Sequence, residues 1–229
     1  MLTIKYVMVS LAALLITSHA HAAIEVSPAI VIFEPKASQE AIITVTNAGD
    51  KITYVTTQPR EVMARGETDE KLRFDPNPTT LGILSTPAKL VLEKGERRGV
   101  RVVAVNPPGS ADRVWRVKIA PAAGKLKAGQ SGVAFLIGYD TLIIQRAANA
   151  TAAITGQRTG KKLTLSNAGN SFGMISEIRQ CPASGECVTL KDTKRLYGNS
   201  SWSVDLPEDG GTVEVNIDGI NNKRETIKI

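Results

Sequence analysis

The sequence predicts an all-β protein made of two β-sandwich domains. Short segments rich in β-branched and other apolar residues recur along the chain with turn residues between them. No segment shows amphipathic periodicity over the length of a helix. This pattern is typical of sandwiches. The composition shifts after Arg146, where the small residues of 147–153 indicate a hinge or a domain boundary before the strand pattern restarts.

The chain begins with a segment typical of a secretory signal peptide. Lys5 supplies a positive charge, and residues 7–16 are apolar but too few to span a membrane. Ala20-His21-Ala22 matches an A-x-A cleavage site. We therefore expect residues 1–22 to be removed, which leaves 207 of the 229 residues as an exported chain without membrane insertion.

The composition of the exported chain excludes several kinds of chemistry. His19 and His21 are the two histidines of the sequence, and both lie in the leader. Without histidine, Ser-His-Asp and Cys-His catalysis and every His-ligated metal site are excluded, and we expect no cofactor. In the full sequence Lys and Arg outnumber Asp and Glu by 28 to 22, but few aromatic residues accompany the charges, so we expect no nucleic acid as a partner.

The expected strands of the first half follow one another at short spacing. Pro28 interrupts the opening segment, and Asn47-Ala48-Gly49-Asp50 forms a turn after a cleanly alternating strand. Residues 66–78 are polar and contain two prolines, so we expect a loop there. The expected strands are 24–33, 41–46, 52–58, 89–92, 99–105 and 114–120.

The second half repeats this organisation on a smaller scale. Residues 162–166 lead into Asn167-Ala168-Gly169-Asn170, which echoes the first turn and suggests two related sandwiches. Cys181 and Cys187 are too few for a structural zinc site, and in an oxidising compartment they are expected to form a disulfide that closes the loop CPASGEC. Two free thiols are the alternative. Further strands are expected at 174–179, 201–206, 212–217 and 225–229.

The most apolar run of the exported chain, residues 132–146, follows a basic, glycine-containing loop at 122–132. If its first residues form a strand, their side chains alternate between two faces. One face carries a large side chain at every position, and the other carries only one. The large set is Val133, Phe135, Ile137 and Tyr139, and the other is Ala134, Leu136 and Gly138. The run fits an ordinary buried core strand. It also fits a strand whose first half is an exposed edge offered to another protein, which is the interpretation we favour.

Several stretches together resemble the PapD-like periplasmic pilus chaperones. TPAKLVLEKGERRGVRV at 86–102 and ITVTNAGDKITYV at 43–55 are similar to motifs of the first domain of that family. VWRVKIAP at 114–121 resembles the strand before its long loop, and VAFLIGYDTLI resembles the donor strand after that loop. VWRV, Tyr139 and the close cysteine pair are similar to the alternate, class 5 branch. The resemblance covers essentially the whole exported chain.

This resemblance implies two immunoglobulin-like sandwiches in an L-shaped arrangement, which we place at 23–147 and 148–229. It implies a periplasmic protein that is not an enzyme. Such a chaperone caps pilin subunits by donor-strand complementation and delivers them to an outer-membrane usher. The donor strand would be formed by Val133, Phe135, Ile137 and Tyr139, and the free protein could hide this apolar row by self-association.

The carboxylate anchor of the PapD type has no match in this sequence. Those chaperones hold the terminal carboxylate of the pilin with an Arg and a Lys, whereas Ile30 and either Thr141 or Leu142 stand near those positions here. We expect other donors, first Arg116, because a guanidinium can bind a carboxylate bidentately, and second Thr141, through its hydroxyl. A solvated or salt-bridged Arg116 is the alternative.

Two other classes of protein fit an exported all-β chain. A structural fimbrial subunit or adhesin should have an N-terminal donor extension and one incomplete domain, whereas this chain shows two complete ones. An exported enzyme would need a pair of carboxylates. The candidates Asp69, Glu70, Asp75 and Asp209 lie in turn-like polar stretches that are typical of solvated charges.

Overall fold

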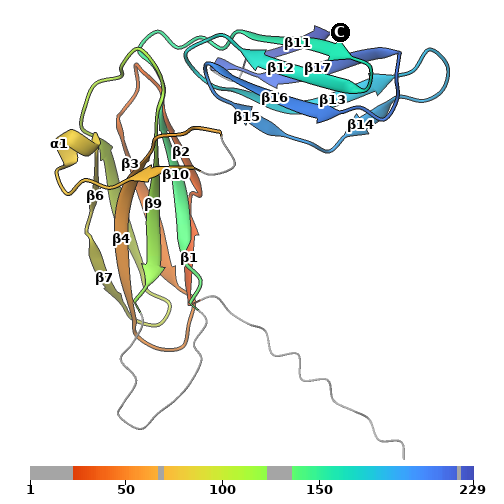
Figure 1. Cartoon of the computed structure of the whole chain (residues 1–229). Helices are drawn as coiled ribbons and strands as arrows, with labels where there is room; N and C mark the ends of the chain where they lie inside the picture. The colour runs from red at the N-terminus through yellow and green to blue at the C-terminus, as the bar shows by residue number, and fades with distance from the viewer. Residues whose placement is uncertain (1–22, 67–69, 123–135, 221–222) are drawn as a thin grey trace, which may run out of the picture.

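The computed structural model describes residues 23–66, 70–122, 136–220 and 223–229. Those residues form four sheets, two in each half of the chain, which confirms the predicted all-β fold class. Figure 1 shows the first sandwich upright and the second lying across its upper end, so the molecule is L-shaped.

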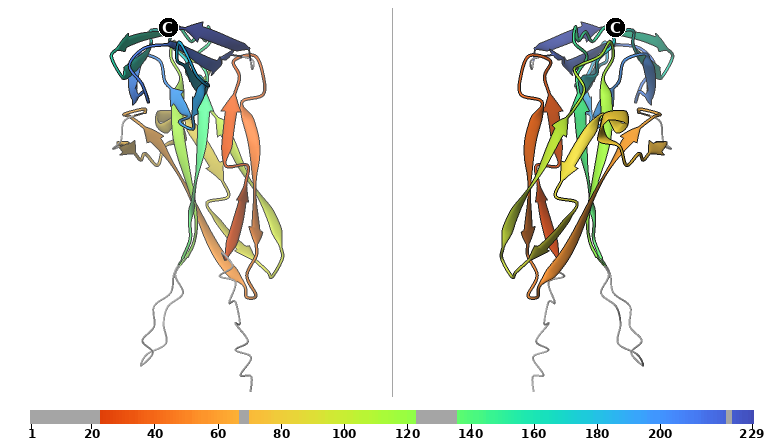
Figure 2. Two further views of the ribbon diagram at one scale, coloured as in Figure 1. Left: turned by 90° about the vertical axis from the view of Figure 1, so that its right-hand side faces the viewer. Right: turned by 90° about the vertical axis from the view of Figure 1, so that its left-hand side faces the viewer.

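Two sheets form the first sandwich, and Figure 2 shows them facing each other. One has the order β1-β3-β8-β6, and the other has the order β2-β10-β9-β4-β5, with β7 also paired to β4. Neighbouring strands are antiparallel except for β2 and β10, which are parallel. The strands are β1 (Ile24–Ser27), β2 (Ile30–Phe33), β3 (Glu40–Asn47), β4 (Thr53–Val62), β5 (Leu72–Arg73), β6 (Ile83–Thr86), β7 (Lys89–Leu92), β8 (Arg97–Ala104), β9 (Arg113–Pro121) and β10 (Tyr139–Gln145).

Alternation along the strands decides which side chains the two sheets enclose. On β9, Trp115, Val117 and Ile119 are fully buried in the core of the first sandwich, while the residues between them lie on the outer face of the sheet. The indole Nε1 of Trp115 donates to the carbonyl oxygen of Leu81 over 2.8 Å, so the polar atom of this large core residue is satisfied. This packing fixes which face of β9 and of its neighbour β10 looks outwards.

The expected loop at 66–78 contains two short regular elements, β5 and the start of helix α1 (Pro78–Leu81). Asn77 caps the helix by accepting a hydrogen bond from Thr79 N. Gly82 ends it in the left-handed conformation, with φ 82°, and the guanidinium of Arg113 occupies the space that a Cβ would need.

The second sandwich is smaller. Its sheets have the orders β11-β12-β16 and β14-β13-β17-β18, with β15 also paired to β13. The expected disulfide between Cys181 and Cys187 is present and links the end of β13 to the residue before β14. The strands are β11 (Ile154–Thr159), β12 (Lys162–Asn167), β13 (Gly173–Cys181), β14 (Val188–Leu190), β15 (Lys194–Leu196), β16 (Ser200–Asp205), β17 (Thr212–Asp218) and β18 (Arg224–Lys228).

The two Asn-Ala-Gly turns have the same role in both sandwiches. Asn47 at the end of β3 and Asn167 at the end of β12 are both buried. The side-chain amide of Asn47 donates to Leu92 O, and that of Asn167 donates to Leu196 O. Each Oδ1 accepts from the backbone N–H two residues further on. The sequence echo therefore corresponds to one structural device, a buried asparagine that ties a strand end to a distant segment.

A buried polar contact joins the two sandwiches. Asp112, 3% exposed, accepts hydrogen bonds from Ala147 N, Ser171 Oγ and Phe172 N. Arg146 is equally buried and donates to Ser171 Oγ and Phe172 O, with its guanidinium carbon 3.9 Å from the centre of the Phe172 ring. The expected hinge at 147–153 is therefore tied down at its first residue.

An apolar cluster lies beside this contact. It combines outward-facing residues of β4, β9 and β10 with two aromatic residues of the second sandwich. Its members are Val62, Val114, Leu142, Ile144, Phe172 and Tyr197. The upper part of the outer sheet face is thus covered by the second sandwich.

Candidate functional site

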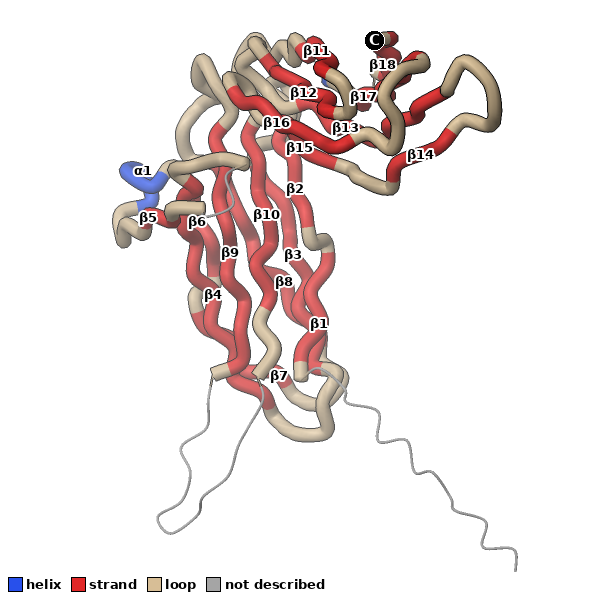
Figure 3. The backbone as a smooth tube through the Cα atoms, turned by 45° about the vertical axis from the view of Figure 1, so that its right-hand side comes forward, coloured by secondary structure: helices blue, strands red, loops and turns tan. Residues whose placement is uncertain are grey.

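The first strand segment changes sheets at Pro28, and this leaves part of β10 with one neighbour. β1 pairs with β3, whereas β2 pairs with β10 in the other sheet, starting with Ile30 opposite Leu142. Figure 3 shows β2 beside the upper part of β10 and β1 lower down in the other sheet. Among the described residues, the edge of β10 from Tyr139 to Thr141 has β9 on one side and no strand on the other. Such an edge is a template for a strand of another chain.

The residues just before this edge carry exposed apolar side chains. Ile137 is 56% exposed and Leu136 is 46% exposed. A Cβ on Gly138 would lie 2.9 Å from the Cβ of Ala120, which is on the outer face of β9. By strand alternation Ile137 belongs to the opposite face, which at Tyr139 packs on the core. Ile137 therefore continues the core-facing row beyond the point where the sandwich covers it.

The structure describes two of the four expected donor residues. Val133 and Phe135 lie outside the described residues. Ile137 is exposed, as a residue offered to a partner should be. Tyr139 instead packs against the core of the first sandwich, and its hydroxyl donates to Ile24 O over 3.0 Å. Tyr139 therefore packs within the first sandwich rather than projecting towards a partner, because that sandwich still covers β10 at this residue.

Charged side chains line the outer face of β4, β9 and β10 next to the second sandwich. Arg60 of β4 lies opposite Arg116 of β9. Arg60 pairs with Asp140 of β10. Arg116 donates from Nε and Nη2 to the two carboxylate oxygens of Glu70, each over 3.0 Å. Each guanidinium on this face therefore has a carboxylate of the same sandwich as its partner.

Arg116 lies where the two sandwiches meet. The hydrogen bond to Glu70 raises the pKa of the Arg116 guanidinium above its ordinary value. Tyr197 of the second sandwich is close enough to contribute to the same rise. Burial in turn raises the pKa of the Tyr197 phenol, because it disfavours the phenolate. Arg195 on β15 brings a further guanidinium to this junction, 5.1 Å from the centre of the Phe172 ring.

The structure separates the two expected anchor residues. Thr141 lies opposite Val117, a core residue, and is 2% exposed, and its Oγ1 has no hydrogen-bond partner among the described residues. Arg116 points to the other side of the same sheet. The inward orientation of Thr141 argues against it as an anchor, whereas Arg116 lies on the outer face of the sheet.

Sequence reasoning did not identify the carboxylate that holds Arg116. Glu70 is expected from the sequence to be a solvated loop charge, yet it makes a bidentate contact and its side chain is 25% exposed. The two residues are 46 positions apart, and no periodicity relates them. The signal that the sequence did contain is the alternation of β9, which places Arg116 on the same face as Val114.

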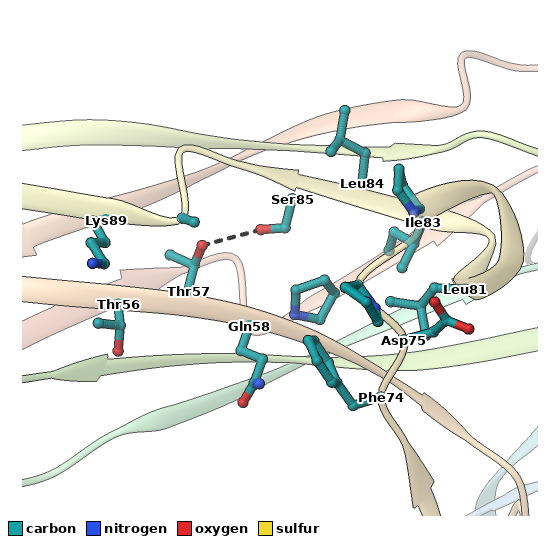
Figure 4. Close-up of a pocket in the computed structure, with 14 residues that line it drawn as sticks. Thr56, Thr57, Gln58, Phe74, Asp75, Leu81, Ile83, Leu84, Ser85 and Lys89 are labelled. Atoms are coloured by element: carbon teal, nitrogen blue, oxygen red, sulfur yellow. Dashed lines mark hydrogen bonds between the residues drawn. The ribbon is translucent and has the colours of Figure 1, made fainter.

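A cavity of about 510 Å³ lies between β4 and the segment from β5 to β7. Figure 4 shows the hydroxyls of Thr57 and Ser85 joined by a hydrogen bond, which is 3.5 Å long, with Phe74 at the side of the cavity. The ionisable side chains of the lining are Asp75 and Lys89. Across the described ranges, no group of His, Cys, Asp and Glu is arranged to hold a metal ion, and no helix is long and apolar enough to cross a membrane.

No protein-family model and no curated protein matches this sequence. Solved structures do match it over nearly its whole length. The class 5 fimbriae chaperone CfaA aligns with a TM-score of 0.68 at 20% identity, over 90% of this chain and 97% of its own. A structure of the Salmonella enterica SafA pilin in complex with the SafB chaperone aligns with a TM-score of 0.59 at 13% identity, over 91% of this chain and 96% of the matched chain. The periplasmic chaperone SfaE aligns with a TM-score of 0.53 at 16% identity, over 90% of this chain and 98% of its own. At these identities the likeness is one of fold, and this chain has the two-sandwich fold of the fimbrial chaperones.

Proposed function

We propose that this protein is a periplasmic chaperone that binds pilin subunits and delivers them to an outer-membrane usher. The observation that carries the proposal is the edge of β10 at Tyr139–Thr141, which has no second strand beside it among the residues the structure describes and continues into the exposed Ile137. Matching structures include a chaperone with its pilin and a chaperone–tip adhesin complex, which supports pilin subunits as the partner. Binding of this kind needs no catalysis and no cofactor.

The physical basis is completion of an unfinished sandwich. A pilin that lacks its last strand exposes core side chains and unpaired backbone groups, and both promote aggregation. Pairing of a pilin strand with the edge of β10 would satisfy the unpaired backbone groups of both proteins. Apolar side chains on one face of the chaperone strand would fill the groove of the pilin. Ile137 lies on the same face of the strand as Tyr139, which packs on the core of the first sandwich. A pilin sandwich docked beyond the end of that core would therefore bury Ile137 in the pilin core.

The same row extends in the sequence to Val133 and Phe135, which we propose as further donor residues. Each apolar side chain that becomes buried contributes roughly 1.5–3 kcal/mol. We propose Arg116 as the residue that binds the terminal carboxylate of the subunit in the cleft. The exported protein would comprise the domains 23–147 and 148–229 after removal of residues 1–22.

Substitution of adjacent residues by aspartate tests the donor row. Ile137→Asp should abolish recovery of a co-expressed pilin with the tagged chaperone from the periplasm, because a charge without a partner cannot be buried in the groove. Leu136→Asp is the matched control from the other face and should retain the complex. Both side chains are exposed in the free protein, so neither change should lower its unfolding temperature.

The two variants also separate the possible failures. A normal yield of complex with Ile137→Asp would refute the donor-strand proposal. Loss with Leu136→Asp but not with Ile137→Asp would assign the groove to the opposite face of the strand.

A further inference from the structure

The guanidinium of Arg116, proposed to bind a terminal carboxylate, already binds a side-chain carboxylate of the same protein. Nε and Nη2 of Arg116 each lie 3.0 Å from a different oxygen of Glu70. This is the parallel, two-bond geometry by which arginine binds any carboxylate, including that of a chain terminus. The side chains of Arg116 and Glu70 are 29% and 25% exposed, so the pair is accessible to solvent.

The acid of this pair is attached differently from that of its neighbour. Asp140, the partner of Arg60, is a residue of β10 and is held by the ladder with β9. Glu70 belongs to no strand and precedes β5, which begins at Leu72 and has two residues. Its carboxylate can leave Arg116 by rotation about side-chain bonds, without any break in a sheet. The acid that holds Arg116 therefore differs from Asp140 in that its backbone is not held by a strand ladder, so both its backbone and its side chain can move away from the guanidinium.

We propose that Glu70 is an internal competitor for the carboxylate site. Its side chain occupies Arg116 in the free protein, and the terminal carboxylate of a bound subunit displaces it. This inference rests on the proposed function, because the chaperone role supplies the competing carboxylate. The two carboxylates repel each other, so they do not share the same two donors of Arg116.

Competition of this kind has a calculable consequence. If Glu70 occupies Arg116 in nine of ten free molecules, an incoming carboxylate binds about tenfold more weakly than it would to the vacant guanidinium. The same factor lowers the stability of the complex. A weaker anchor favours release of the subunit when another strand replaces that of the chaperone.

The test measures carboxylate binding by the free, full-length exported protein. The probe is N-acetyl-glycyl-alanine with a free terminal carboxylate, and binding is followed through the NMR signal of the Arg116 Nε–H group. Glu70→Gln should tighten binding about tenfold, and the C-terminal amide of the same dipeptide should not bind. Arg116→Ala combined with Glu70→Gln should abolish the gain, as followed by the backbone signals of β9.

Two matched variants separate competition from general electrostatics. Asp140→Asn removes a carboxylate from the same face, where it acts on Arg116 through space, and Glu40→Gln removes one from a pair on the other sheet. Each should change binding less than twofold. Unchanged or weaker binding in Glu70→Gln would overturn the proposal, since it would make Glu70 a residue that orients Arg116.

The outcome is distinguishable from failure of the proposed function. The dipeptide contains no strand for β10 to pair with, so its binding does not depend on the donor row. Normal pilin complexes without tightening in Glu70→Gln would refute the competitor alone. Tightening without any pilin complex would refute the chaperone role and leave a carboxylate site whose internal ligand is Glu70.

Discussion

The two sandwiches share a buried asparagine at a strand end but differ in how their last strand is paired. β18 pairs with β17 at all five of its residues, and its sequence RETIK is charged, which blunts an edge against further pairing. In the described part of the chain, β10 has neighbours on both sides only from Leu142 onwards, and exposed apolar residues precede its open edge. The same architecture thus ends in a charged edge strand in the second sandwich and in an edge preceded by apolar residues in the first, and the proposed partner strand would pair with the latter.

The largest effect is expected from the feature that the sandwiches share. Asn47→Ala should lower the free energy of unfolding of the first sandwich, and Asn167→Ala that of the second, each by about 3 kcal/mol. Their side chains make five and four hydrogen bonds, and a buried group left unpaired costs about 1–3 kcal/mol. Urea unfolding followed by hydrogen exchange would assign each loss to a sandwich. If only one of the two substitutions lowered the free energy of unfolding strongly, the two Asn-Ala-Gly turns would be alike in sequence but not in their contribution to stability.

A smaller effect is expected at the junction. Asp112→Ala removes three hydrogen bonds, two of them to residues of the second sandwich, and should cost about 2 kcal/mol. Because the sandwiches are coupled there, we expect one calorimetric transition in the native protein and two in the variant. Asp209→Ala, at an exposed residue, is the control and should leave a single transition. Two transitions in the native protein would show that the sandwiches are already independent.

The sequence predicts the fold class because sandwich strands are local patterns. Alternation identifies the inward residues of β9, and the Asn-Ala-Gly echo identifies equivalent turns. The change of sheets at Pro28 is not predictable in the same way. Residues 24–27 and 30–33 are equally short, and their sheets are decided by pairing with β3 and β10 rather than by their own residues.

The site is less predictable than the fold. Arg116 is identifiable by residue type and by the alternation of its strand, whereas the acid that holds it comes from a segment with no regular pattern. The inward orientation of Thr141 follows from its register with Val117, which only the assembled sheet reveals. Strand periodicity thus predicts the face on which a residue lies, and tertiary pairing determines what it contacts.

The smallest expected effect concerns Tyr197, a residue of the second sandwich that the first sandwich helps to bury. Gly66 packs so close to its ring that an added Cβ would lie 3.2 Å from a ring carbon, and the side chain belongs to the apolar cluster at the junction. Burial raises the pKa of its phenol, although Arg195 and Arg116 act in the opposite direction. The midpoint of its titration should therefore lie above the ordinary value of 10.0.

This shift has a definite sign in stability. A phenol whose folded pKa is raised contributes stability that is fully present below pH 10, and that contribution is lost as the pH rises through the folded pKa. The difference in phenolate absorbance between the native protein and Tyr197→Phe isolates this one titration. In the Asp112→Ala background the midpoint should fall back towards 10, because a loosened junction readmits water to the ring. An unshifted midpoint in the native protein would show that the junction leaves Tyr197 solvated, and the two sandwiches would then differ in their pairing without being coupled.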